Sequence, residues 1–175
     1  PKQTMKELKT MIRAYHEAGI SVVMDVVYNH IYSTEHGPFQ NTVPDYYYRM
    51  EPDGRFQNGT GVGNETASEH EMYRKYMIDS LTHWVKEYQI DGFRFDLMGI
   101  HDVRTMNAIR EAMDALDPRI LLYGEGWDMG TGLAPEDKAK KDNAAQLPRI
   151  GFFNDTERDA IKGAEVYGSI KRGFV

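Results

Sequence analysis

Acidic residues follow short apolar runs at a regular interval in this chain. Asp96, Glu125 and Asp155 each stand at the end of such a run, 29 and 30 residues apart. A unit of one strand, one helix and their connections takes about 30 residues. The chain is therefore predicted to repeat a strand–helix unit in series, with a carboxylate at the same end of three parallel strands.

The predicted strands are the most apolar segments of the chain. They lie at 20–28, 92–96, 120–123 and 150–153. Residues 20–28 (ISVVMDVVY) are apolar on both phases, which predicts a strand buried on both faces of a parallel sheet. Four such units fit either a (β/α)8 barrel or an open doubly wound sheet, and periodicity does not choose between them.

Three helices are predicted from apolar residues at three-to-four spacing. The first stripe covers 5–15, and Gly19 follows where a helix C-cap would stand. The second covers 73–88, and residues 68–71 (SEHE) are predicted to form a capping box at its start. The third helix is predicted to begin after Asp102, whose side chain can cap it.

A long loop interrupts the regular spacing. Residues 31–67 are rich in Gly, Pro, Asn, Asp and Tyr, and they lengthen the interval between Asp25 and Asp96 to 71 residues. We interpret them as a loop inserted between a strand and its helix, within one domain that spans 1–175. Long loops of this kind usually carry function.

Composition argues against several kinds of partner and site. The chain has 27 acidic and 21 basic residues without a Lys/Arg run, which predicts neither a nucleic-acid interface nor a membrane contact. It has no cysteine for a thiolate zinc site or a thiol nucleophile. Residues 16–20 and 70–74 lack the second histidine of a zinc-protease motif, and 59–64 lack the spacing of a dinucleotide fingerprint. We predict no cofactor and no metal, and the compartment is left open.

Arg94 and Asp96 are predicted to share one face of a strand. In residues 92–96 (GFRFD) the period of two puts both phenylalanines on one side and the two charges on the other. An arginine there can donate to the carboxylate and keep it ionised, as a carboxylate nucleophile requires; a structural ion pair is the alternative. Asp25 interrupts a buried strand, so it also needs a partner such as Arg94.

Glu125 ends the next strand, with glycine on both sides in residues 123–127 (YGEGW). Because neighbouring strands lie about 4.8 Å apart, Asp96 and Glu125 can approach the ~5 to 5.5 Å separation that retaining glycosidases use. The pair predicts a retaining glycoside hydrolase with Asp96 as the nucleophile and Glu125 as the general acid/base. A helix N-terminal acid is the alternative for Glu125.

Further side chains are candidates to bind a sugar. His30 follows the strand at 20–28 and is predicted either to donate to a sugar hydroxyl or to act as a capping residue. Trp127, Tyr28 and the tyrosines at 46–48 offer ring faces that suit the apolar faces of pyranose rings. Tyrosine runs also commonly pack loops.

Three motifs resemble, in order, the first three conserved regions of the α-amylase family of glycoside hydrolases: residues 25–30 (DVVYNH), 92–96 (GFRFD) and 124–127 (GEGW). The longer forms resemble type I pullulanases in particular: residues 61–69 (GVGNETASE), 92–102 (GFRFDLMGIHD) and 123–128 (YGEGWD). The resemblance covers essentially the whole chain.

The resemblance implies a fold and an activity. The fold is a partial (β/α)8 TIM barrel in the α/β class, with the predicted strands as about the third to the sixth and the reacting groups at their carboxyl ends. The activity is cleavage of α-1,6-glucosidic links in pullulan, starch, glycogen and other branched α-glucans. Calcium occurs in the family's amylases near the asparagine that Asn29 matches, but one matching residue is too little to predict a metal here.

The resemblance also assigns residue roles. Asp96 is implied as the nucleophile and Glu125 as the acid/base. The residues implied to orient them or to bind substrate are Arg94, His30, Asp25, Tyr28, Asn29, Leu97 and Trp127.

Two family features are expected outside the chain. The fourth conserved region, with its His-Asp pair, is expected beyond Val175, and the opening strands before Pro1. We therefore expect an internal fragment of a catalytic domain without turnover of its own. The alternatives are an α-1,4-acting amylase, glucosidase or transferase of the same family, and a non-catalytic carbohydrate-binding relative, which is expected to have lost Asp96, Glu125 or Arg94.

Overall fold

Four parallel strands form the centre of the computed structural model, which describes residues 2–166 and 169–174. They are β1 (Val23–Val26), β2 (Gly92–Phe95), β3 (Leu121–Gly124) and β4 (Gly151–Phe152), and they lie side by side in chain order. This order confirms the predicted series of parallel strands, although the connection between β3 and β4 holds a 3-10 helix in place of an α-helix. β1 is shorter than the predicted segment 20–28, because only its four residues pair with β2.

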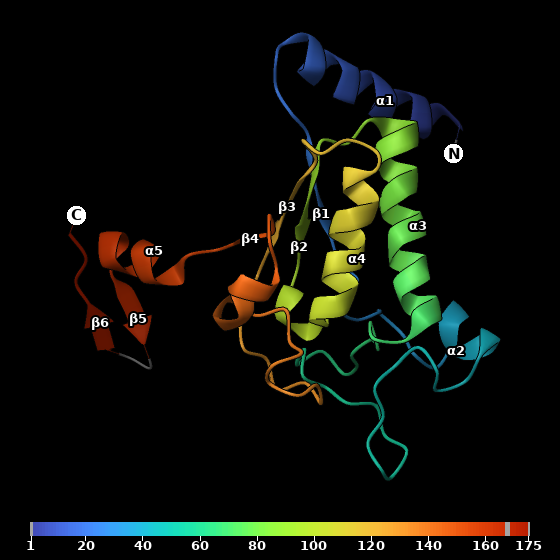
Figure 1. Cartoon of the computed structure of the whole chain (residues 1–175), viewed down its shortest axis with the longest axis vertical. Helices are drawn as coiled ribbons and strands as arrows, with labels where there is room; N and C mark the ends of the chain where they lie inside the picture. Colours follow the sequence, from blue (N-terminus) through green and yellow to red (C-terminus); the bar gives the residue numbers. More distant parts are fainter. Residues whose placement is uncertain (1, 167–168, 175) are drawn as a thin grey trace.

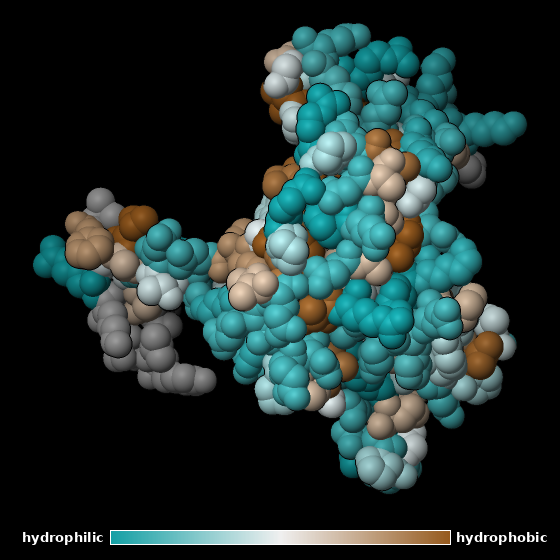
Figure 2. Space-filling model, in the orientation of Figure 1, coloured by the Kyte–Doolittle hydropathy of each residue, from teal (hydrophilic) through white to brown (hydrophobic). Residues whose placement is uncertain are grey.

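Helices cover one face of this sheet. α1 (Lys2–Glu17), α3 (Glu71–Tyr88) and α4 (Val103–Asp114) are the long helices, and α3 and α4 pack side by side along the sheet (Figure 1). The face of the molecule in Figure 2 is mainly hydrophilic, with scattered apolar residues. Helices on a single face fit a barrel, because a doubly wound sheet carries helices on both faces.

Shorter elements surround the sheet. α5 and the β5–β6 hairpin project from the rest of the molecule, beyond β4 (Figure 1). These elements are α2 (Pro38–Thr42), the 3-10 helices η1 (Met98–Ile100) and η2 (Lys141–Gln146), α5 (Asp155–Lys162), β5 (Ala164–Val166) and β6 (Ser169–Lys171).

The core lies between the sheet and the helices. Phe93 and Phe95 of β2 are fully buried there, as the period of two predicts. They pack with the inward stripes of α3 and α4, which include Met77, Leu81, Met106, Ile109 and Met113. Burial of β1 on both faces is a wrong prediction, since Val23 and Asp25, which alternate with the less exposed Met24 and Val26, are exposed.

The helix ends confirm two of the three predicted caps. Gly19 follows α1 with a positive φ of 74°, and the Asp102 carboxylate accepts from the Thr105 N–H at 2.8 Å to cap α4. The capping box at 68–71 is wrong. The N-cap of α3 makes no side-chain cap bond, and the buried Ser68 hydroxyl instead donates to Asp102 Oδ2 at 2.7 Å.

No helix in the described ranges has both the length and the apolar character needed to cross a membrane.

Candidate active site

The carboxyl ends of neighbouring strands bring the predicted acids to one edge of the sheet. Asp25 lies opposite Arg94 in the β1–β2 register, and Phe95 lies opposite Gly124 in the β2–β3 register. Asp96 and Glu125 are therefore the next residues along two adjacent strands. The Glu125 N–H donates to the Phe95 carbonyl at 3.1 Å, so this acid begins directly where the ladder ends.

Arg94 contacts all three carboxylates at this edge. Nη1 donates to Asp25 Oδ1 at 2.9 Å and to Asp96 Oδ1 at 3.0 Å, and Nη2 lies 2.7 Å from Glu125 Oε1. The predicted pairs with Asp96 and Asp25 are confirmed, although the Asp25 side chain is 65% exposed and not buried as predicted. The described residues leave that side of β1 uncovered.

The carboxylates also keep Arg94 protonated. Its partial burial opposes the charged form, but the hydrogen bonds to Asp96 and Asp25 and the charge of Glu125 raise the pKa of Arg94 above its ordinary value. One fixed cation facing three carboxyl groups leaves an excess of acidic groups on the open face. An arginine fork holds such groups in defined orientations.

Asn29 fixes Asp96 from the other side. It is fully buried, and its Nδ2 donates to the Asp96 backbone carbonyl at 2.8 Å and to Oδ2 at 3.0 Å. Its Oδ1 lies 2.6 Å from His30 Nδ1, so the amide also holds the imidazole beside the carboxylate. Each carboxylate oxygen of Asp96 thus has one donor, from Arg94 or Asn29.

Leu97 contributes through its backbone. Its φ of 40° is in the left-handed region, and its N–H donates to Glu125 Oε2 at 3.0 Å. Gly99, in η1, donates to the Glu125 backbone carbonyl at 3.0 Å. A Cβ on Gly99 would lie 1.9 Å from the Trp127 carbonyl oxygen, so only glycine allows the η1 turn to pack this closely on the segment after Glu125.

A hollow of about 420 Å³ opens beside Glu125. Trp127 lines it, as its position after the acid predicted, and Phe153 and Arg158 also line it but were not predicted. The available signal for Phe153 was its place at the end of the fourth predicted strand. The lining residues are Arg94, Glu125, Trp127, Phe153, Asn154, Asp155 and Arg158.

Tyr28 is not available to a sugar, so its prediction as a sugar-binding ring is wrong. It is only 6% exposed, its hydroxyl donates to Ser80 Oγ at 2.8 Å, and its ring packs edge-on against Tyr76. Burial raises the pKa of Tyr28 to about 12. The physical reason is the strand period, because Tyr28 shares the phase of the buried Val26 and points toward the helices.

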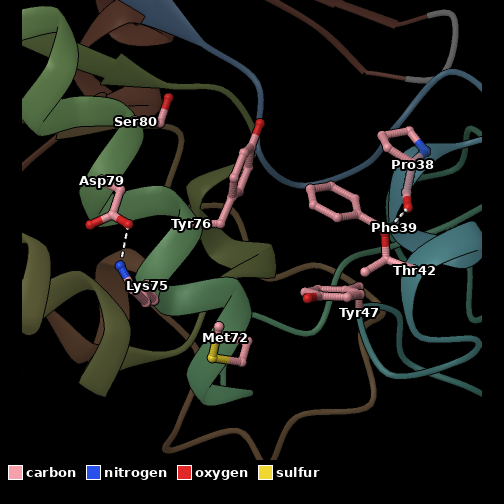
Figure 3. Close-up of a pocket in the computed structure, with 9 residues that line it drawn as sticks. All are labelled: Pro38, Phe39, Thr42, Tyr47, Met72, Lys75, Tyr76, Asp79 and Ser80. Atoms are coloured by element: carbon pink, nitrogen blue, oxygen red, sulfur yellow. Dashed lines mark hydrogen bonds and ion pairs between the residues drawn. The ribbon is translucent and has the colours of Figure 1, made fainter.

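The tyrosines at 46–48 pack the long loop. Tyr48 is fully buried, and the Tyr47 ring stacks on Phe39 with 4.8 Å between centroids. Figure 3 shows Phe39, Tyr47 and Tyr76 around a second hollow, of about 540 Å³, next to α2 and α3. Asp25, Asp96 and Glu125 do not line this hollow. The structure therefore supports the alternative interpretation, in which the tyrosines pack the loop.

The arrangement can support double displacement at a sugar. Two carboxyl groups stand on adjacent strands, and separate donors orient each of them, which is the layout of a nucleophile and an acid/base. In the described parts of the chain, no three His, Asp or Glu side chains gather as a metal site would require.

Known proteins are similar to this chain in sequence and fold. The family model described as "Alpha amylase, catalytic domain" matches residues 3–67. The pullulanase of Bacillus subtilis (strain 168) is 50% identical over 93% of this chain and 23% of its own length. The likeness to solved structures confirms the predicted fold class, part of a (β/α)8 barrel.

Two solved pullulanase structures align over nearly all of the chain. That from Paenibacillus barengoltzii, in complex with maltohexaose and α-cyclodextrin, is 52% identical with a TM-score of 0.93, over 96% of this chain and 26% of that one. That from Anoxybacillus sp. LM18-11, complexed with maltotetraose, is 50% identical with a TM-score of 0.94, over 99% of this chain and 25% of that one. This chain thus spans about a quarter of the length of these relatives.

Proposed function

The chain belongs to the pullulanase group of the α-amylase family, and from this premise we propose that it forms part of the catalytic domain of an enzyme that hydrolyses α-1,6-glucosidic links in pullulan and branched α-glucans. The observation that carries the proposal is the contact of one guanidinium, Arg94, with both Asp96 and Glu125 at the ends of adjacent strands. A carbohydrate-binding relative without catalysis would not need this pair.

The proposed reaction is a double displacement in which Asp96 is the nucleophile. Its carboxylate attacks the anomeric carbon while Glu125, in its acid form, gives a proton to the departing glycosidic oxygen. Glu125 then takes a proton from water, and the resulting hydroxide equivalent releases the sugar from Asp96 with retention of configuration. Arg94 and Asn29 support the attack by holding both oxygens of Asp96 in a fixed direction.

Neighbouring groups are proposed to bind the sugar. The Nδ1 side of His30 faces Asn29, which leaves Nε2 as the ring atom to donate to a sugar hydroxyl beside Asp96. Trp127 offers an aromatic wall next to Glu125, in the hollow of about 420 Å³. Linear and cyclic malto-oligosaccharides are the ligands of the two solved relatives, which supports an α-glucan as the substrate here.

Product analysis tests the linkage. The full-length protein that contains this chain is incubated with pullulan, and the products are separated by size and linkage. Maltotriose is expected, because it results when only the α-1,6 links are cut. Panose, or activity on linear amylose alone, would move the protein to an α-1,4-acting member of the family. No hydrolysis of any α-glucan would refute the proposed function and favour a binding role.

A further inference from the structure

Arg49 lies in the long loop, directly after the tyrosines at 46–48, and the sequence analysis did not identify it as a functional residue. We propose that Arg49 is a positioning residue for the proposed reaction: it locks the turn after β2 and the loop after β3 together, and so sets the placement of Glu125 relative to Asp96. The inference rests on the proposed function for its catalytic consequence, and on the contacts of Arg49 for its structural one.

The Arg49 guanidinium joins three separate segments of the chain. The first segment is the long loop and the residues that follow it: Nη1 lies 3.1 Å from Glu65 Oε1, and Nη2 donates to Glu69 Oε2 at 2.7 Å. Nη1 also donates to the Ile100 carbonyl of η1 at 2.8 Å, and to Thr131 Oγ1, in the loop after β3, at 2.7 Å. These partners are 16 to 82 residues away from Arg49 in sequence.

The two segments that Arg49 joins are those that hold the acid/base. The η1 turn ends at Ile100, and the same turn supplies the Leu97 and Gly99 N–H groups that bind Glu125. The loop with Thr131 follows Trp127, whose carbonyl packs directly on Gly99. Arg49 therefore binds both segments, and residues of the same two segments contact Glu125 or follow it directly.

The centre of the cluster around Arg49 is buried, although Glu69 at its edge is partly exposed. The side chain of Arg49 is 6% exposed and that of Glu65 is 0% exposed. Glu65 also accepts from the Gly59 N–H at 2.6 Å and from the Thr131 hydroxyl at 2.5 Å. A Cβ on Gly59 would lie 2.4 Å from Glu65 Oε2, so the loop backbone is pressed against the carboxylate. Because these polar groups are buried and bonded to one another, breaking their contacts is costly. The cluster should therefore hold the segments rigidly together.

The charges in the cluster are fixed. Burial disfavours the charged form of Arg49, but the hydrogen bonds and charges of Glu69 and Glu65 outweigh it and raise the pKa of Arg49. Lysine at this position would keep the charge but not the fork, since an ammonium cannot reach Glu65, Ile100 and Thr131 in the fixed planar geometry of a guanidinium. The variant Arg49→Lys thus separates geometry from charge.

Arg110 provides a matched control. Its side chain is also 6% exposed, Nη1 donates to the Ile120 carbonyl at 2.7 Å, and Nη2 lies 2.7 Å from Asp114. Ile120 precedes β3, at the opposite end of that strand from Glu125. Arg110→Lys therefore removes a comparable buried fork without touching either turn.

The experiment compares Arg49→Lys and Arg110→Lys in the full-length protein. The measurements are kcat and KM on pullulan, well below the melting temperature, and amide hydrogen exchange. We expect Arg49→Lys to lower kcat about ten- to a hundredfold with little change in KM, because a small misplacement of a reacting group has this cost. Exchange should rise at residues 97–101 and 126–132. Arg110→Lys should keep the parent kcat and the parent exchange in both segments.

Three outcomes would overturn the inference: unchanged exchange in Arg49→Lys, raised exchange with the parent kcat, or equal loss of kcat in both variants. If Arg49→Lys does not fold, Thr131→Val replaces it, since this change removes only the hydroxyl between Arg49 and Glu65. A parent that cleaves no α-glucan would refute the proposed function instead, and the exchange data would still decide whether Arg49 holds the two turns.

Discussion

Two clusters in this molecule have nearly the same composition, an arginine among carboxylates, but they differ in how deeply the arginine and its central carboxylate are buried. Arg94 contacts Asp25, Asp96 and Glu125 at an open edge of the sheet, where these carboxylates are between 21% and 65% exposed. Arg49, with a side chain that is 6% exposed, contacts Glu65, which is 0% exposed, and the partly exposed Glu69, together with a hydroxyl and a carbonyl. Composition alone would not tell the two apart.

The difference lies in what each cluster leaves unsatisfied. Glu65 accepts from three protein donors, those of Arg49, Gly59 and Thr131, so it has no capacity for a substrate. Asp96 and Glu125 have donors that fix their direction, yet they keep a side open to solvent. The closed cluster is suited to stabilise a fold, and the open one to react. Substitutions in both clusters can therefore test whether this division is correct.

The largest effect is expected at Asp96. Asp96→Asn in the full-length protein keeps the shape and the contact with Arg94, but it removes the nucleophile, so kcat on pullulan should fall by about 10⁴-fold or more. The melting temperature should stay close to that of the parent. Asp117→Asn is the control, because Asp117 also pairs with an arginine, Arg119, but on an exposed loop away from the sheet edge. Substantial turnover by Asp96→Asn would reject Asp96 as the nucleophile.

The same substitution in the two clusters gives the sharpest contrast. Glu125→Gln should lower kcat by about 10³-fold through loss of the acid/base, with little effect on stability. Glu65→Gln should mainly lower stability, and its loss of kcat should be smaller than that of Glu125→Gln, because it disturbs the cluster that positions Glu125 without removing a reacting group. The substitution leaves the buried Arg49 with one carboxylate partner fewer. It also places the NH2 group of glutamine against the donors of Arg49, Gly59 and Thr131. Together these effects should lower the free energy of unfolding by about 3 kcal/mol. Urea unfolding and steady-state kinetics on both variants decide the matter. If Glu65→Gln is as stable as the parent, the contacts of Glu65 with its three donors do not stabilise the fold as we infer.

The open cluster could be predicted from sequence because its information is local. The period of two in β2 separates Arg94 and Asp96 from Phe93 and Phe95, and this separation is what the structure has. Asp96 and Glu125 each end a recognisable apolar run, and parallel strands bring such ends to one edge. The same period, applied to Tyr28, would have placed its ring with Val26 on the helix side.

The closed cluster could not be predicted because its partners are distant in sequence. Arg49 stands in an irregular loop, and its contacts with Ile100 and Thr131 cross 51 and 82 residues. No periodicity connects such positions. The wrong capping box at 68–71 has the same origin, since the Ser68 hydroxyl serves the cap of α4, 34 residues later, and not its own helix. Local patterns identify a polar residue near a helix start, but tertiary contacts choose its partner.

The smallest predicted effect concerns His101, whose pKa is influenced by charges in both clusters, Arg49 and Asp96. It is fully buried, and its ring nitrogens have no hydrogen-bond partner among the described residues. Burial, helped by the positive charge of Arg49 and opposed by the charges of Asp102 and Asp96, lowers the pKa of His101 to about 3. Below pH 6.5 the unfolded chain takes up a proton that the folded protein does not accept until about pH 3, so stability falls as the pH falls through this window.

Between pH 7 and pH 5 this loss should amount to about 2 kcal/mol, or a few degrees of melting temperature. The test is the melting temperature of the full-length protein at both pH values, with His101→Phe to remove the titrating group and His36→Gln, at an exposed histidine, as the control. His101→Phe should flatten the pH dependence, and His36→Gln should not. If the melting temperature of His101→Phe falls as steeply with pH as that of the parent, the acid sensitivity comes from other groups. The surroundings of His101 would then tolerate a charge better than its burial implies.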